Sequence, residues 1–147
     1  MHFSFSTAQL GPSAIKITNQ IMINLPVVFK QGTLIYNIKD QTCLDVHSID
    51  RISLERIIPI LKRHGIQCFI FGVKRNKLMV FYEDIKSLHL QAFYDHWRYF
   101  YNISFIKVDN LCKILDYRVI YLLTTDFANL IKPAYEEIIK LPEICTC

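Results

Sequence analysis

Glycine is scarce in this chain, with four glycines among 147 residues. Loops that cradle phosphate groups use several glycines, because the backbone N–H groups must approach the ligand closely. The sequence contains no G-x-G-x-x-G, G-x-x-x-x-G-K-S/T or G-x-S-x-G motif. The dinucleotide-binding, P-loop and nucleophile-elbow signatures are therefore excluded.

Long apolar runs and a secretory signal are also missing. No run approaches the 18 apolar residues of a membrane span, so we expect no membrane partner. The start, Met1 to Thr7, lacks the basic region and apolar core of a signal peptide. We expect a protein that is not secreted.

Cysteine usage indicates a reducing compartment. The five cysteines are an odd number, and Cys43, Cys68 and Cys112 lie in apolar runs where a buried thiol is the usual state. The predicted location is intracellular, either cytoplasmic or nucleoid/nuclear. Cys145 and Cys147 form one C-x-C pair without a second pair to complete a zinc site, which favours a frayed tail and leaves metal binding open.

Charge and composition describe a folded, weakly basic chain. Hydrophobic residues make up 52% and charged residues 20%, and the net charge is +4. This composition excludes wholesale disorder, and the length predicts a single domain over 1–147. The charge permits a polyanionic partner without requiring one, because no block of five or six like charges occurs.

The middle of the chain reads as a β-hairpin. Two β-rich runs, 66–73 and 77–83, flank the polar turn Lys74-Arg75-Asn76. A strand is predicted over 33–38, and a helix with Asp50 or Ser53 as its N-cap and Gly65 at its end. A second helix over 84–99 and a strand over 102–108 follow, although 88–94 alternates well enough to be a strand instead.

The order of these elements predicts the fold class. Strand, helix, strand, strand, helix, strand over 33–108 is the ferredoxin-like split βαβ motif (βαββαβ), an α+β fold with a four-stranded antiparallel sheet. Residues 1–13 form an N-terminal extension, and 14–24 a strand or a short edge piece. Two additional C-terminal helices are expected within 109–142.

Nucleic-acid binding is the function that this arrangement predicts. In such folds an open sheet face stacks bases on aromatics, here Phe69, Phe71 and Phe81, and basic loops hold phosphates. The alternative is burial of both sheet faces. We expect a non-catalytic or catalytically degenerate protein without cofactors, which binds single-stranded DNA or RNA in a nucleoprotein or replication assembly. The candidate contacts are Lys74, Arg75, Lys77, Arg98, Lys107, Lys113 and Arg118.

Three stretches, the first of them the predicted strand over 33–38, resemble the rolling-circle replication initiators, the HUH endonucleases. His89-Leu90-Gln91 is similar to their His-apolar-Gln metal motif, and Tyr117-Arg118-Val119-Ile120-Tyr121 to their nucleophile helix. The resemblance implies Mg²⁺ or Mn²⁺ held by His89 and Gln91, and attack of Tyr117 or Tyr121 on a DNA phosphodiester. The alternative for the two tyrosines is a pair of aromatics on a helix surface.

A third passage resembles the STAS regulatory domains. It comprises the helix 54–64, Gly65-Ile66 and the strand 67–73. This likeness implies regulation through protein–protein contacts. A patch containing Tyr94, Trp97 or Tyr101 would then mediate a dimer or hetero-complex, and the sequence leaves the oligomeric state open.

Overall fold

The computed structural model describes residues 4–8, 23, 25–101, 104–114, 116–142 and 144, and of Phe100 and Tyr101 only the backbone. Most of the expected N-terminal extension and of the possible strand at 14–24 lies outside these residues. Cys145 and Cys147 also lie outside them. The prediction of a single domain over 1–147 stays a prediction.

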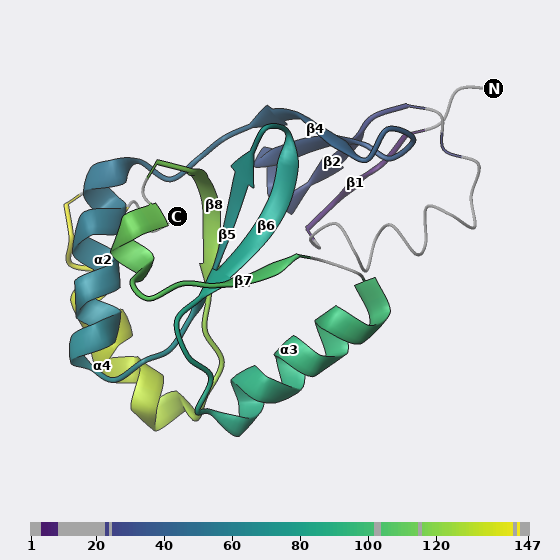
Figure 1. Ribbon diagram of the computed structural model, residues 1–147. Helices are drawn as coiled ribbons and strands as arrows, with labels where there is room; N and C mark the ends of the chain where they lie inside the picture. The colour runs from purple at the N-terminus through teal and green to yellow at the C-terminus, as the bar shows by residue number, and fades with distance from the viewer. Residues whose placement is uncertain are drawn as a thin grey trace.

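Two four-stranded sheets dominate the described part of the chain (Figure 1). The first sheet has the order β1-β2-β3-β4 and is built from β1 (Ser6–Thr7), β2 (Val27–Phe29), β3 (Leu34–Asn37) and β4 (Thr42–Val46). The second sheet has the order β7-β6-β5-β8 and is built from β5 (Phe69–Lys74), β6 (Lys77–Tyr82), β7 (Phe105–Lys107) and β8 (Arg118–Leu123). The helices are η1 (Lys30–Gly32), α2 (Arg51–Arg63), α3 (Leu88–Tyr101), η2 (Leu111–Ile114) and α4 (Ala128–Ile138).

The predicted ferredoxin-like antiparallel sheet is wrong. The strand expected at 33–38 is β3, which pairs with β2 and β4 in the first sheet and with no strand of the second sheet. The sheets are also mixed, because β1 runs parallel to β2 and β7 runs parallel to β6. The linear order of elements was read correctly between 50 and 108, but order alone does not determine which strands pair.

The two expected C-terminal helices are correct only in part. Residues 111–114 form the short helix η2, and 118–123 form β8, which pairs antiparallel with β5. Apolar residues buried on both faces of a strand give a continuous run, and that run also fits a helical stripe. The last expected helix exists as α4.

Both faces of the second sheet are buried. One face packs against α3 and the first sheet in a cluster that includes Phe69, Phe71, Val73, Val80 and Leu90. The other face packs against α2, α4 and η2 in a cluster that includes Ile70, Phe81 and Val119. Phe69, Phe71 and Phe81 are buried, so these three rings are not open for base stacking and the alternative of two-sided burial is confirmed.

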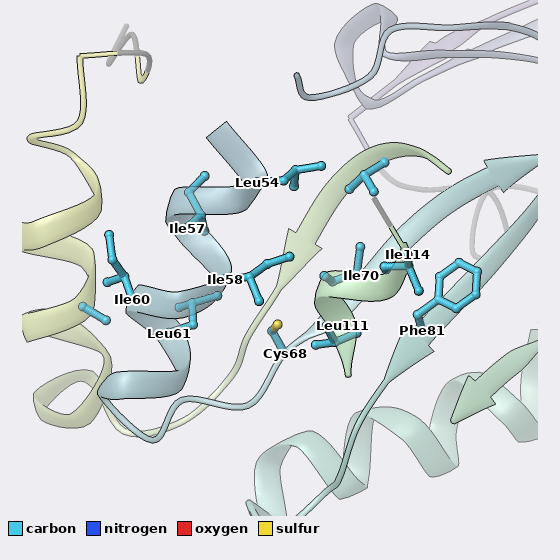
Figure 2. Packing of buried hydrophobic residues seen from close by; sticks show 12 residues of the cluster. Leu54, Ile57, Ile58, Ile60, Leu61, Cys68, Ile70, Phe81, Leu111 and Ile114 are labelled. Carbon is cyan, nitrogen blue, oxygen red and sulfur yellow. The ribbon is translucent and has the colours of Figure 1, made fainter. Parts of the chain in front are cut away.

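Helix α2 confirms the most detailed local prediction. Asp50 is its N-cap, and its carboxylate accepts the backbone N–H of Ser53 at 2.9 Å. Gly65 follows the helix with φ +68°, a conformation that glycine adopts without strain. The apolar stripe of Leu54, Ile58 and its neighbours lies toward β5 and η2 in Figure 2.

Helices long and apolar enough to cross a membrane do not occur among the described residues.

Candidate anion-binding site

The tip of the β5–β6 hairpin carries the densest group of predicted contact residues. Arg75 and Asn76 form a two-residue turn with φ 49° and 62°, the conformation of a type I′ turn. Lys74 and Lys77 are paired directly across the hairpin. The turn is therefore one residue shorter than predicted. The three cationic residues of the tip lie within four consecutive positions, two of them at the strand ends and one in the turn.

A surface hollow of about 430 Å³ opens at this tip. It is lined by Lys74, Arg75, Lys77 and Met79. All three cationic residues are exposed. Volume and charge together suit a small anionic molecule.

The three cations of the tip lack carboxylate partners. Among the described residues, no Asp or Glu oxygen lies within 4.0 Å of their charged nitrogens. Other lysines of the protein are neutralised, for example Lys62 by Glu83 at 2.6 Å. Like charges directly opposite on two strands destabilise a hairpin, so the tip holds a positive charge that an anion would offset.

The tip also meets the first sheet. The backbone N–H of Cys43 in β4 donates to the carbonyl oxygen of Asn76 at 2.9 Å, and Figure 1 shows the turn beside β4. Burial raises the pKa of the Cys43 thiol to about 11, and the nearby positive charge of Arg118 partly opposes this. The structure thus brings Arg118 near the tip, and Cys43 is a neutral thiol at neutral pH.

The other predicted contact residues do not join this group. Lys107 lies on β7, where its amine is 3.9 Å from Asp84. Arg98 lies on α3 and donates to the hydroxyl of Tyr94 at 3.1 Å. Lys113 is exposed on η2.

The prediction that His89 and Gln91 together hold a divalent cation is wrong. Both lie on α3, and residues two apart on a helix point about 200° apart. His89 is 3.7 Å from the carboxylate of Asp126, and Gln91 donates to Asp95 at 3.0 Å.

The predicted nucleophile helix is also wrong, because Tyr117 precedes β8 and Tyr121 lies within it. Tyr121 is stacked on Phe71 with ring centroids 4.1 Å apart and an interplanar angle of 13°. Burial raises the pKa of the Tyr121 hydroxyl, which opposes formation of a nucleophilic phenolate. Lys74 Nζ lies 4.5 Å from the centroid of the Tyr117 ring, a contact that the sequence analysis missed.

A magnesium site would need several oxygen ligands, with carboxylates first among them. No group of three or more His, Cys, Asp or Glu side chains converges anywhere in the described part of the chain. The residues present there do not fit a divalent metal centre.

Comparison with known proteins identifies the family. A family model described as haloacid dehalogenase-like hydrolase matches residues 1–144. The chain belongs to the haloacid dehalogenase-like hydrolases. A search of curated proteins finds no match.

Solved structures of haloacid dehalogenase-like hydrolases share the fold. One from Bacteroides thetaiotaomicron has a TM-score of 0.70 at 8% identity, covering 93% of this chain and 50% of its own. One from B. subtilis has a TM-score of 0.64 at 11% identity, covering 96% and 55%. A sugar phosphatase of HAD subclass IIB has a TM-score of 0.55 at 11% identity, covering 95% and 49%. The chain spans about half the length of these proteins.

Family membership corrects the functional predictions. The resemblances to HUH endonucleases and to STAS domains are wrong, since the family match covers nearly the whole chain. The predicted nucleic-acid partner, the role in replication and the alternative of a regulatory interaction domain are wrong with them. Motifs of three to five residues had carried the resemblance to HUH endonucleases, and the structure places these residues in other elements.

Proposed function

We propose that this chain takes part in the hydrolysis of small phosphorylated molecules, and that its described residues bind the phosphorylated substrate at the tip of the β5–β6 hairpin. The observation that carries the proposal is the hollow lined by Lys74, Arg75 and Lys77, whose charges no carboxylate of the described residues neutralises. The family description, hydrolase, and the sugar phosphatase among the structures of similar fold support it.

The chemistry of the tip suits recognition of a phosphate group. Lysine ammonium groups bind phosphate oxygens as point charges, and a guanidinium such as that of Arg75 can donate two parallel hydrogen bonds. The thioether and methylenes of Met79 give the hollow an apolar wall for the carbon part of a substrate. The tip can therefore bind and orient an organic phosphate.

The reacting groups lie elsewhere in this proposal. Haloacid dehalogenase-like hydrolases typically use Mg²⁺, which stabilises the negative charge of a transferring phosphoryl group. The described residues do not supply a fitting set of ligands, so we derive no step through the metal. Because the chain spans half the length of similar structures, the nucleophile and the metal ligands would come from outside the described residues.

An intracellular location is part of the same proposal. Cys43, Cys68 and Cys112 are free thiols, and such thiols persist in reducing compartments.

Calorimetric titration tests the proposed binding. The wild-type chain should bind inorganic phosphate and glucose 6-phosphate, and should not bind glucose. Replacing Lys74, Arg75 and Lys77 together with Gln should weaken phosphate binding roughly tenfold or more, since three charge-assisted contacts are lost. The control replaces Lys86, Lys132 and Lys140, three exposed lysines outside the hollow, with Gln. Equal affinity of the two triple variants would disprove the site.

A further inference from the structure

Tyr117 lies beside Lys74, which lines the basic hollow. It follows η2, where its backbone N–H donates to the carbonyl of Ile114 at 3.0 Å, and it directly precedes β8. Its ring packs edge-on against Phe81 with centroids 4.7 Å apart at 63°. The ring therefore has a fixed position on the face of the second sheet that also carries Met79.

The Lys74 side chain lies over this ring. Its Nζ is 4.5 Å from the ring centroid and 3.4 Å from the Tyr117 hydroxyl. A lysine side chain at an exposed strand end samples many rotamers, and ordering it costs entropy. An ammonium within about 6 Å of an aromatic face is attracted by the ring quadrupole. The ring thus holds Lys74 in one region before any ligand binds.

Gly72 provides the space that this arrangement needs. It lies two residues before Lys74 on the same face of β5, and it is buried. A Cβ atom added there would lie 3.3 Å from Phe81 Cε2 and 3.5 Å from Tyr117 Cβ. An alanine there would touch Tyr117 at an ordinary distance, and the Phe81 ring would have to shift by a few tenths of an ångström.

We propose that Tyr117 is a positioning residue, which holds the Lys74 ammonium at the mouth of the hollow and so raises the affinity for a phosphate group. This inference rests on the proposed function. The inference adds Tyr117, which does not line the hollow and acts through Lys74. Tyr117 and Lys74 are distant in sequence and adjacent only in the fold.

Phosphate affinity of single and double variants tests the positioning role. Tyr117→Leu removes the ring and should weaken binding of inorganic phosphate about two- to five-fold, the range of an exposed cation–π contact. Tyr117→Phe keeps the ring and should bind within about two-fold of wild type. In a Lys74→Gln background, Tyr117→Leu should have no further effect, because the contact is already gone. Tyr135→Leu, which removes an exposed tyrosine of α4, is the matched control and should leave affinity unchanged.

Proton NMR of the lysine side chains measures the contact between Lys74 and the Tyr117 ring directly, and a purely structural role of Tyr117 would not produce its signal. The ε-methylene signal of Lys74 should be shifted upfield by the Tyr117 ring, relative to that of Lys77, in the wild type and in Tyr117→Phe. The shift should disappear in Tyr117→Leu. If Tyr117→Leu does not fold, the Lys74 shift in the wild type and its retention in Tyr117→Phe still decide the question.

The possible failures are distinguishable. If the triple Gln variant at the tip binds phosphate as well as the wild type does, the proposed function itself fails. If that variant loses binding while Tyr117→Leu binds normally, or if the Lys74 signal is unshifted in the wild type, only the positioning role of Tyr117 is overturned.

Discussion

Replacing Lys77 with Glu should stabilise the protein and remove its response to phosphate. Lys77 lies directly opposite Lys74, so the change turns a like-charge cross-strand pair into an opposite-charge pair. Each such pair contributes about 0.2–1 kcal/mol, destabilising in the first case and stabilising in the second. Both lysines are exposed, and solvent screening favours the lower half of that range. We therefore expect a net gain of about 0.5–1 kcal/mol at low ionic strength.

Thermal unfolding measures this gain. For a chain of about 150 residues, 1 kcal/mol corresponds to roughly 2–4 °C in Tm, so Lys77→Glu should unfold about 1–4 °C higher than the wild type. Lys140→Glu, with the same charge change after α4, is the control. The difference between the two variants should shrink in 1 M NaCl, where the screening length is about 3 Å.

Phosphate should reverse the ranking of the same proteins. A ligand that binds only the folded state stabilises it by RT ln(1 + [L]/Kd), which is about 1.4 kcal/mol at ten times Kd and so exceeds the gain expected for Lys77→Glu. The wild type and Lys140→Glu should gain Tm in phosphate over sodium chloride of equal ionic strength, and Lys77→Glu should not. If Lys77→Glu is no more stable than Lys140→Glu, or gains as much from phosphate as the wild type, the electrostatic reasoning is refuted.

Three further perturbations test the core, one ion pair and the donor set. Phe71→Ala should lower the free energy of unfolding by about 3–5 kcal/mol in urea, because Phe71 is fully buried and stacked on Tyr121; a loss below 1 kcal/mol would contradict the two-sided burial of β5. Hydrogen bonds from His64 and Arg63 lower the pKa of Glu137 below its ordinary value of 4.5, so its stabilisation is present above that pH and is lost as the pH falls toward the folded-state pKa. Glu137→Gln should therefore flatten the dependence of Tm on pH between about 5 and 3, and an unchanged slope would argue against the pair. Millimolar Mg²⁺ should cause no saturable shift in the amide NMR signals of the described residues, among which no metal cluster occurs, and a saturable shift there would contradict this.

Local structure was predictable from the sequence where one segment contains its own signals. Helix α2 has its N-cap Asp50 and its terminal Gly65 within 16 residues. The hairpin likewise joins two apolar runs through a short polar turn, and its register follows from that turn.

Pairing between distant segments was not predictable in the same way. Nothing in the sequence of β3 states that it pairs with β2 and β4, and not with β6 and β7 as in the predicted sheet. The run Arg118–Leu123 fits a helical stripe as well as a buried strand, and only its place beside β5 decides. Once it is a strand, Tyr121 is partly buried and stacked on Phe71, and its raised pKa opposes the nucleophilic role that the spacing suggested.

The candidate site was likewise predictable only where its residues are close together in the sequence. The three cations at the tip lie within four consecutive residues, and the sequence named all three as candidate contacts. The role assigned to them was wrong, because a basic turn attracts any phosphate-bearing partner and does not distinguish a strand of nucleic acid from a small molecule. The contact between Lys74 and Tyr117 spans 43 positions, and no local pattern indicates it.

Mapping phosphate binding by amide NMR tests the central claim most directly. Titrating inorganic phosphate into the uniformly ¹⁵N-labelled chain should shift the amide signals of residues 74–77 most strongly, with a saturable dependence on concentration. Smaller shifts should appear at Tyr117 and Arg118. Saturable shifts confined to another part of the chain, or no saturation at any residue of the tip, would contradict the assignment of the hairpin tip as the phosphate-binding site.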